Sequence, residues 1–587
     1  MLPAYMKQTS LFLTLLALSV VLVACGGGGG GGGAGNGATT ISVPGAPGGL
    51  TATAGDGSVS LAFAAPASSG GATITGYTAA CTAGSTTRTA SGGASPIVVT
   101  GLSNGTAYTC TVAATNSVGT GAAATVPVTP AGTVVPGLFR GSIVLGSPTG
   151  ASIKANVLSP DQSGTVWVSY GTSPGSYDRQ SASGALIAGT PLELVLDGLV
   201  ANTKYYYRLH FQATGQSGAG PTEEYTFHTA RGAGSTFTFT IQADSHLDEN
   251  SDLELYRRTL ANVLADAPDF HVDLGDTFMT EKHSEPLSAT VRMAPDAATV
   301  NARYAYERGN FGIVSHSVPL FLVNGNHDAE LGWLNDGTAQ NVAIWATSAR
   351  QQYFANPVPG TFYSGDSVEE PFVGRRASWY AWRWGDALFV VLEPYWSSKK
   401  LPGGDAWGYT LGERQYRWLA DTLSSSTATF KFVFVHNLVG GLDGQMRGGI
   451  EAAPFFEWGG RGSDGVYVFD QKRPGWTLPI HQLLVRNRLT AVFHGHDHLY
   501  AKQELDGIVY QEVPQPSARN SSSGPTLAAD YHYASGIILS SSGHLRVSVA
   551  PTGITAQYVR AWLPASETDQ RRNRQIDDTW TVGSIRN

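Results

Sequence analysis

The pattern of apolar and polar positions divides the chain into two stretches that predict different kinds of secondary structure. Residues 44–231 contain short alternating strands separated by Gly-, Ser- and Pro-rich turns, without helical periodicity, which is typical of β-sandwiches. From residue 235 onward, apolar runs that predict strands alternate with amphipathic stretches that predict helices, such as 253–264, which Pro268 ends. The pattern therefore predicts two all-β sandwiches followed by an α/β domain.

Five apolar runs of the second stretch end in residue types that bind metal ions. These residues are, in chain order, Asp244, His246, Asp276, Asn326, His436, His496 and His498. Ligands bind at the carboxyl ends of the strands in open α/β sheets, so we expect these side chains to lie close together. Aspartate, asparagine and histidine in this number predict a metal site.

Composition narrows the choice of partners. A chain of 587 residues is too long for one core and suggests roughly three or four domains. Charged residues make up 14% of the chain and the formal net charge is −8, so most of the exposed surface must be neutral and polar. This balance argues against nucleic acid or an anionic membrane surface as a partner.

The first 43 residues predict export and a lipid anchor. Lys7, the apolar stretch 11–23 and the small residues after it follow the plan of a secretory signal, and the stretch is shorter than the roughly 20 residues of a spanning helix. Residues 22–25, Leu-Val-Ala-Cys, resemble the lipobox of bacterial lipoproteins, whose cysteine becomes the lipidated first residue; the alternative is an ordinary cleaved signal. We predict a signal peptide over 1–24 and a glycine-rich linker over 25–43. Cys25 would then anchor the protein in the bacterial cell envelope, in the outer membrane or periplasm or facing outside.

Two further cysteines, Cys81 and Cys110, lie in the first β-rich region. An exported chain can keep a disulfide, and with Cys25 lipidated these two are the remaining pair. The alternative is two buried free thiols.

The two β-rich regions resemble known modules. Over 44–130, Ile74-Thr75-Gly76-Tyr77 and the later Gly101-Leu102 and Tyr108 resemble fibronectin type III domains, which suggests a surface polymer as a further partner. Over 137–231, Gly198-Leu199 and Tyr205 repeat that spacing. Together with the strand around Trp167, they resemble the β-sandwich that precedes the catalytic domain of purple acid phosphatases.

The strand-end motifs, in their order, resemble the calcineurin-like metallophosphoesterase superfamily over residues 235–560. The motifs are Asp-x-His, Gly-Asp, Gly-Asn-His-Asp, a single His after a strand, and Gly-His-x-His. The resemblance implies a four-layer α/β sandwich and a metal-dependent phosphoric ester hydrolase. Residues 561–587 are polar and are expected to form a loose tail.

The resemblance also implies a ligand set for two divalent or trivalent ions, most simply Mn, Fe or Zn. One ion would take Asp244, His246, Asp276 and His498, and the other would take Asp276, Asn326, His436 and His496. Asp276 would bridge the ions, and a hydroxide between them would attack the phosphorus. Two aspartates return only two negative charges to such a pair, which leaves positive charge for a phosphate.

His327 is the histidine that this family uses without binding metal, so the resemblance implies that it protonates the leaving alkoxide or binds a phosphoryl oxygen. Asp328 would fix the tautomer of the His327 imidazole. Asn437 and His494 are next to predicted ligands, and they either support these ligands or fill the core. Glu281 and His283 follow Asp276 closely, and the sequence leaves open whether they reach the substrate. Met279 stands where purple acid phosphatases have their iron-binding tyrosine, so we expect no purple colour.

The sequence therefore predicts an exported binuclear phosphoesterase that acts on small phosphate mono- or diesters. One alternative is a nucleotidase or a phosphodiesterase of narrow range. Another is a surface-binding protein that uses the fibronectin-like domains on an inactive phosphoesterase scaffold, and the complete set of ligand residues argues against it.

Overall fold

The structure is a computed structural model that describes residues 41–584 except for positions 56, 85, 104, 131–137, 285–286, 289, 400–405 and 442–445. The predicted signal peptide, Cys25 and nearly all of the linker lie outside the described residues. The chain divides into two compact units, Met1–Val134 and Val135–Asn587. Among the described helices, none is long and apolar enough to cross a membrane.

The first unit is a β-sandwich, as predicted. Alternation along its strands buries residues such as Leu61, Val99 and Val112 between two sheets. One sheet contains β1 (Gly48–Gly55), β2 (Ser58–Ala64) and β5 (Ile97–Thr100). The other, in the order β4-β3-β6-β7, contains β3 (Ile74–Ala83), β4 (Thr86–Gly92), β6 (Tyr108–Asn116) and β7 (Thr120–Val128).

A disulfide joins the two central strands of the four-stranded sheet. Cys81 and Cys110 are direct register partners on β3 and β6, both are fully buried, and they are bonded to each other. The predicted pairing is confirmed.

Reduction of this disulfide is expected to destabilise the first unit alone. The bridge closes a loop with a sequence separation of 29, so its loss should lower the free energy of unfolding by about 3–4 kcal/mol. Calorimetry of the Cys81→Ala/Cys110→Ala variant should show one transition at a lower temperature and the other unchanged. Two unchanged transitions would contradict the expectation.

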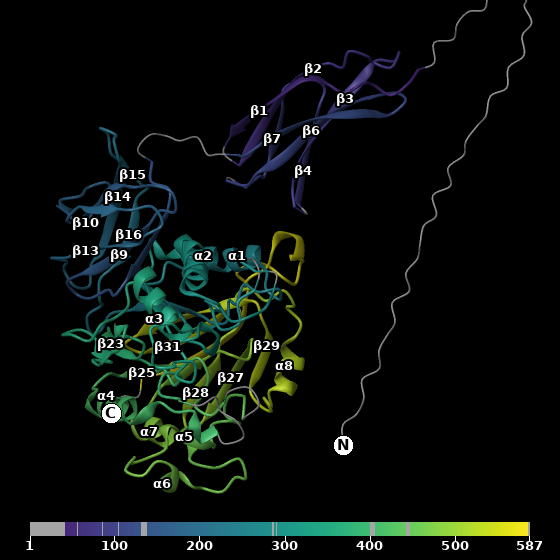
Figure 1. The fold of residues 1–587 in the computed structure, drawn as a ribbon. Coiled ribbons are helices and arrows are strands. Elements are labelled where there is room, and N and C mark those ends of the chain that lie inside the picture. Colours follow the sequence, from purple (N-terminus) through teal and green to yellow (C-terminus); the bar gives the residue numbers. More distant parts are fainter. Residues whose placement is uncertain are drawn as a thin grey trace, which may run out of the picture. The chain divides into compact units, whose positions relative to one another are not determined.

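The second unit is built around two large sheets that pack face to face (Figure 1). The nine-stranded sheet, in the order β13-β9-β8-β19-β18-β17-β30-β31-β32, contains β8 (Ser142–Gly146), β9 (Ile153–Leu158), β13 (Leu192–Leu196), β17 (Phe237–Gln242), β18 (Phe270–Asp273), β19 (Leu320–Leu322), β30 (Gly543–Ala550), β31 (Gly553–Arg560) and β32 (Ile576–Gly583). The eight-stranded sheet, in the order β20-β23-β24-β25-β26-β28-β27-β29, contains β20 (Ser364–Gly365), β23 (Tyr380–Trp384), β24 (Ala387–Val391), β25 (Phe430–Phe434), β26 (Ala491–His494), β27 (Leu499–Leu505), β28 (Ile508–Glu512) and β29 (Ile537–Ser540).

Helices cover the outer faces of both sheets, which gives the predicted four layers (Figure 1). On the nine-stranded side they are α1 (Leu253–Ala265), α2 (Ala297–Ser315) and α3 (Val342–Tyr353). On the eight-stranded side they include α4 (Gly412–Ser425), α5 (Phe456–Gly459) and α7 (Ile480–Arg486). A cluster of aromatic rings, with Phe239, Phe389 and Phe432 at its centre, fills the space between the sheets.

The second sandwich exists, but it is not separate from the α/β domain. Its six-stranded sheet, which includes β10 (Gly164–Gly171) and β14 (Lys204–Ala213), faces strands that continue the nine-stranded sheet. The continuity arises where β8 pairs with β19 through Gly146 and Leu320. A Cβ at Gly146 would lie 2.5 Å from the Ala355 carbonyl oxygen, so only glycine allows this close approach.

The long connections of the α/β domain contain helices α2 and α3, which pack on the nine-stranded sheet. Of the strands after residue 500, β28 and β29 join the eight-stranded sheet and β30 and β31 the nine-stranded one. One expectation about this domain was wrong. Residues 561–587 are not a loose tail, since β32 pairs with β31 and buries Trp580 in the central core.

Candidate metal centre

The predicted ligands come from the ends of five strands in both sheets. Strands β17, β18 and β19 are parallel neighbours, as are β25 and β26, so their carboxyl ends lie along one rim. Each strand is almost wholly buried, and the candidate ligands lie in the loop that follows it. The backbone N–H of His496, after β26, donates to Asp244 Oδ2, after β17, at 2.9 Å. This hydrogen bond connects the ligand loops of the two sheets.

The structure brings six of the predicted ligands into two adjoining groups. Asp244, His246 and His498 form one, and Asp276, His436 and His496 form the other, with ligand atoms within 4.8 Å of one another in each.

Asp276 lies between the two groups. Its Oδ2 is 3.1 Å from His436 Nε2 and 3.8 Å from His246 Nε2. This position suits a carboxylate that two ions share. The seventh predicted ligand, Asn326, precedes His327, whose backbone N–H donates to Asp276 Oδ1 at 2.7 Å.

Hydrogen bonds at the far side of two histidine rings fix which nitrogen faces the centre. His436 Nδ1 donates to the Leu274 carbonyl oxygen at 2.9 Å, which leaves its Nε2 as a lone pair. His246 Nδ1 is 3.4 Å from Asp248 Oδ2, on the side away from Asp244. Such outer contacts orient metal-binding imidazoles and raise their basicity.

Several buried polar atoms at the centre have no hydrogen-bond partner in the protein. They are Asp244 Oδ1, His246 Nε2, Asn326 Oδ1 and His436 Nε2. An orphaned buried polar atom is costly and rare. Four of them converging from three loops are explained at once by cations that they coordinate, so the residues fit the two metal ions that the ligand set implies.

The charges around the centre favour added positive charge. Burial lowers the pKa of His246, but Asp244, Asp248 and Asp276 together raise it to about 10. Burial lowers the pKa of His496 well below its ordinary value, so this ring is neutral, as a ligand must be. The carboxylates of Asp244, Asp248 and Asp276 therefore stabilise a positive charge at the centre.

The ligand loops have strained backbones. Asp244, His246, Asp276, His496 and His498 all have positive φ, between 52° and 82°. Non-glycine residues rarely adopt this conformation, and it clusters at functional sites where the surroundings enforce it. One enforcing contact is that of Gly275 with Gly325, since a Cβ on Gly275 would lie 2.2 Å from the Gly325 nitrogen.

Gly275→Ala is therefore expected to disrupt the centre. It combines a positive φ of 93° with a clash against backbone, and overpacking of this kind costs about 1–3 kcal/mol beyond the conformational penalty. Thermal unfolding and metal content would measure the effect. Gly475→Ala is the matched control, because Gly475 has a φ of 83° but open space around it. Equal effects of the two substitutions would contradict the packing argument.

The structure corrects the role predicted for Asp328 and identifies the residue that holds His327. Asp328 does not contact the His327 ring, because its carboxylate accepts four backbone N–H groups, from Asp276, Thr277, Phe278 and Gly325. It therefore fixes the loop that carries Asp276. The partner of His327 is Glu281, whose Oε2 lies 2.8 Å from His327 Nδ1. The only hint of this in the sequence was the closeness of Glu281 to Asp276 along the chain.

The other flanking residues are buried supports. Asn437 Oδ1 accepts hydrogen bonds from the hydroxyls of Tyr395 and Tyr409 at 2.6 and 3.0 Å. His494 Nδ1 meets Glu512 at 2.6 Å. His283 is buried, and both of its ring nitrogens lack hydrogen-bond partners. Met279 is also buried, so the tyrosine position of purple acid phosphatases holds a thioether here.

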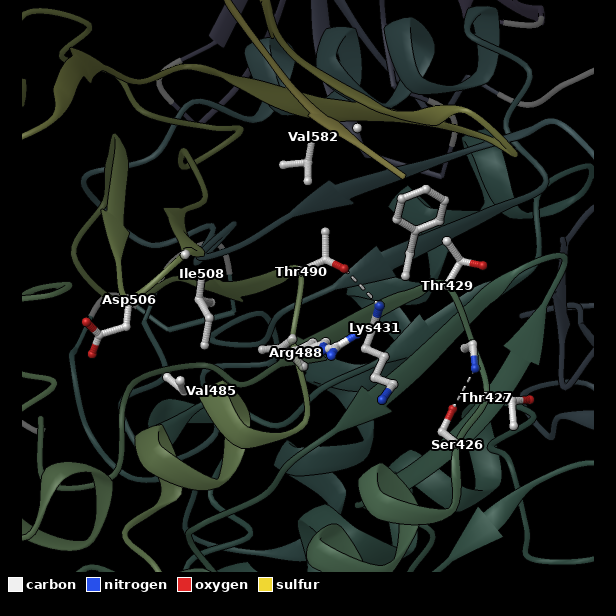
Figure 2. A pocket seen from close by; sticks show the side chains of 15 residues that line it. Ser426, Thr427, Thr429, Lys431, Val485, Arg488, Thr490, Asp506, Ile508 and Val582 are labelled. Carbon is white, nitrogen blue, oxygen red and sulfur yellow. Dashed lines mark hydrogen bonds between the residues drawn. The ribbon is translucent and has the colours of Figure 1, made fainter. Parts of the chain in front are cut away.

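A cavity of about 480 Å³ lies at the opposite ends of the strands (Figure 2). It is lined by residues that begin β25 and precede β26, including Lys431, whose N–H donates to Thr490 Oγ1 at 3.0 Å. None of the predicted ligands lines it. The candidate metal centre therefore lies outside this cavity, at the carboxyl ends of the strands.

Comparisons with known proteins agree with this architecture. Residues 237–500 match the family model described as calcineurin-like phosphoesterase, and residues 45–130 match that of the fibronectin type III domain. Comparison with curated proteins gave no significant match.

Two solved structures share the fold. The structure of PhoD has a TM-score of 0.54 and 14% identity, and the match covers 76% of this chain and 90% of that one. Purple acid phosphatase PPD1 from seeds of yellow lupin (Lupinus luteus) has a TM-score of 0.51 and 12% identity, with coverage of 90% and 92%. Together with the family models, they confirm the predicted resemblance of the chain to a fibronectin type III domain followed by a calcineurin-like phosphoesterase domain.

Proposed function

The chain carries a calcineurin-like phosphoesterase domain over residues 237–500, and on that premise we propose that it is an exported enzyme that uses two metal ions to hydrolyse phosphate mono- or diesters. The observation that carries the binuclear assignment is the set of orphaned buried ligand atoms around Asp276. Asp244, His246, Asp276 and His498 would hold one ion, and Asp276, Asn326, His436 and His496 the other. Ligands of nitrogen and oxygen without thiolate suit Mn, Fe or Zn.

Bound there, the ions would orient the phosphoryl group and lower the pKa of water. The protein's own contribution to proton transfer is His327, whose ring centroid is 5.8 Å from that of His246. Glu281 accepts a hydrogen bond from His327 Nδ1–H, so in the doubly protonated ring the Nε2–H is the one that can protonate the leaving alkoxide. The His327 side chain is 18% exposed, so a substrate can reach it.

Hydrolysis of a chromogenic phosphate monoester and its bis-ester tests the proposal. Metal-stripped protein should be inactive, and Mn²⁺, Zn²⁺ or Fe²⁺ should restore turnover. The ratio of the two rates shows whether the enzyme prefers phosphate monoesters or diesters. Hydrolysis of nucleoside monophosphates tests the nucleotidase alternative. No turnover of any of these esters with any of the metals would contradict the proposal and favour the binding-protein alternative.

We also propose attachment to a bacterial envelope through lipidated Cys25. The Cys81–Cys110 disulfide supports export, because disulfides persist in oxidising compartments. The full-length chain should fractionate with membranes and the Cys25→Ser variant should not. Equal fractionation of both would contradict the anchor.

The first unit offers a face suited to an uncharged surface polymer. The outward side chains of its four-stranded sheet are small and neutral, and in the described residues they include Thr78, Ala80, Thr82, Thr87, Thr89, Ser91, Thr109, Thr111, Ala113, Ala123 and Thr125. Arg88 is on the opposite face, because it pairs with buried Cys81 and its Nε donates to the Gly101 carbonyl at 3.2 Å. Among the described residues of these strands, the outward face carries none of the Trp, Tyr and Arg anchors typical of protein interfaces.

Co-sedimentation with insoluble neutral polysaccharide tests this attachment. The full chain should sediment with it, and Thr82→Lys/Thr109→Lys should remain in solution. Thr53→Lys, on an exposed position of β1 in the other sheet, is the control and should still sediment. Failure of the unmodified chain to sediment would contradict the proposal.

A further inference from the structure

One arginine of helix α2 lies beneath two of the three ligand loops that come from the nine-stranded sheet. Arg303 is 1% exposed, and its guanidinium donates to three backbone carbonyls. Nε donates to Phe278 at 2.9 Å, Nη1 to Leu247 at 3.4 Å, and Nη2 to His246. One side chain therefore connects the loop after β17 with the loop after β18.

These carbonyls belong to the strained parts of the two loops. His246, Leu247 and Met279 have φ values of 52°, 50° and 51°. The carbonyl oxygens of His246 and Phe278 are in the peptide groups that lead into Leu247 and Met279. Backbone of this kind persists only where the surroundings hold it. A rigid fork of donors can hold three carbonyls in one arrangement, whereas a lysine ammonium has no such planar geometry.

A buried carboxylate accompanies the guanidinium. Glu307, one turn further along α2, is fully buried, and its Oε1 is 3.0 Å from Arg303 Nη2. Although the two groups are close, neither Glu307 oxygen accepts a well-aligned hydrogen bond. Such a pair adds little to stability in comparison with well-packed apolar residues. Its position beneath two ligand loops of the metal centre points to a role in positioning.

We propose that Arg303, with Glu307 as its counter-ion, is a positioning residue that keeps the loops of Asp244, His246 and Asp276 in the geometry that binds metal. The inference rests on the metal centre of the proposed function. It concerns affinity for the ions, so it can be tested without any substrate.

The test compares metal binding with folding in the full chain. Arg303→Met alone would leave Glu307 buried without its partner, so the variant to make is Arg303→Met/Glu307→Leu. We expect the metal-free double variant to fold but to unfold at a somewhat lower temperature, because three buried carbonyls lose their donor. Its dissociation constants for Zn²⁺ or Mn²⁺, from competition with a chelator, should rise about 10–100-fold, the range for outer contacts of metal ligands. If the double variant does not fold, Arg303→Lys takes its place, with the same expectation.

Arg308→Met is the matched control. Arg308 is on the same helix, is fully buried, and also donates to three backbone carbonyls, those of Ser142, Asn156 and Tyr353. These carbonyls are not in the ligand loops, so this variant should lose stability but bind metal normally. Unchanged metal affinity in the Arg303 variant, or an equal loss in the Arg308 variant, would overturn the inference. Absence of metal binding by the unmodified protein would instead refute the proposed function.

Discussion

Replacing Asp276 by Asn is expected to abolish metal-dependent hydrolysis. Asn keeps the shape of the side chain but removes the charge that both groups of ligands share, and it offers one oxygen where two ions need a bridge. The loss of kcat/KM should exceed the roughly 10–100-fold that follows loss of an outer contact. Rates measured with elemental analysis of the same samples would show activity and bound metal falling together.

Asp296→Asn is the matched control for this substitution. Asp296 caps α2 by accepting the Thr299 N–H at 2.8 Å, and Asn caps helices as well as Asp. Its activity should be unchanged. Full activity of Asp276→Asn would refute the bridging role.

His327→Ala is expected to lower kcat about 10²–10⁴-fold, the range for a positioned acid, while both metal ions remain bound. The ring is not among the grouped ligands, so its removal should leave the metal content unchanged. Steady-state kinetics with a substrate that has a poor leaving group would give the largest effect, because protonation matters most there.

Glu281→Gln separates orientation from acidity. Glutamine can still accept the hydrogen bond from His327 Nδ1 but carries no charge, so kcat should fall less than in His327→Ala. A loss of metal in His327→Ala, or an unchanged kcat, would contradict the assignment of His327 as the acid.

The sequence was sufficient to predict that the candidate ligands lie close together, because each of them follows a buried strand. Parallel neighbours such as β17 and β18 place the residues after them at one rim. The order of the motifs then distinguished this site from isolated Gly-Asp pairs. The two sandwiches, the disulfide and the alternation of strands and helices were predictable from local patterns for the same reason.

What the sequence did not predict depends on contacts between distant segments. Glu281 reaches His327 over 46 residues, and no periodicity links them. Asp328 has the same type of side chain whether it accepts from a histidine ring or from four backbone amides. No sequence motif marked Arg303, because its three acceptors are backbone carbonyls of segments that lie 25–57 residues away along the chain.

The end of the chain was misjudged because its charges are satisfied internally. Arg574 reaches Asp266 at 2.7 Å and Arg560 reaches Asp577 at 2.6 Å, so a polar composition there does not mean exposure. Trp580 supplies the apolar anchor, and its Nε1 donates to Gln511 Oε1 at 2.8 Å. Burial of Trp580 and pairing with β31 therefore order this segment although most of its residues are polar.

The most direct test of the binuclear centre is the number of ions bound per chain. Metal-free protein titrated with Zn²⁺ or Mn²⁺, followed by elemental analysis after removal of free metal, should bind two ions, and Asp276→Asn should bind fewer. Two ions in the unmodified chain and a deficit in the variant are the result that we predict. No bound metal, or two ions held equally well without the Asp276 carboxylate, would contradict the account.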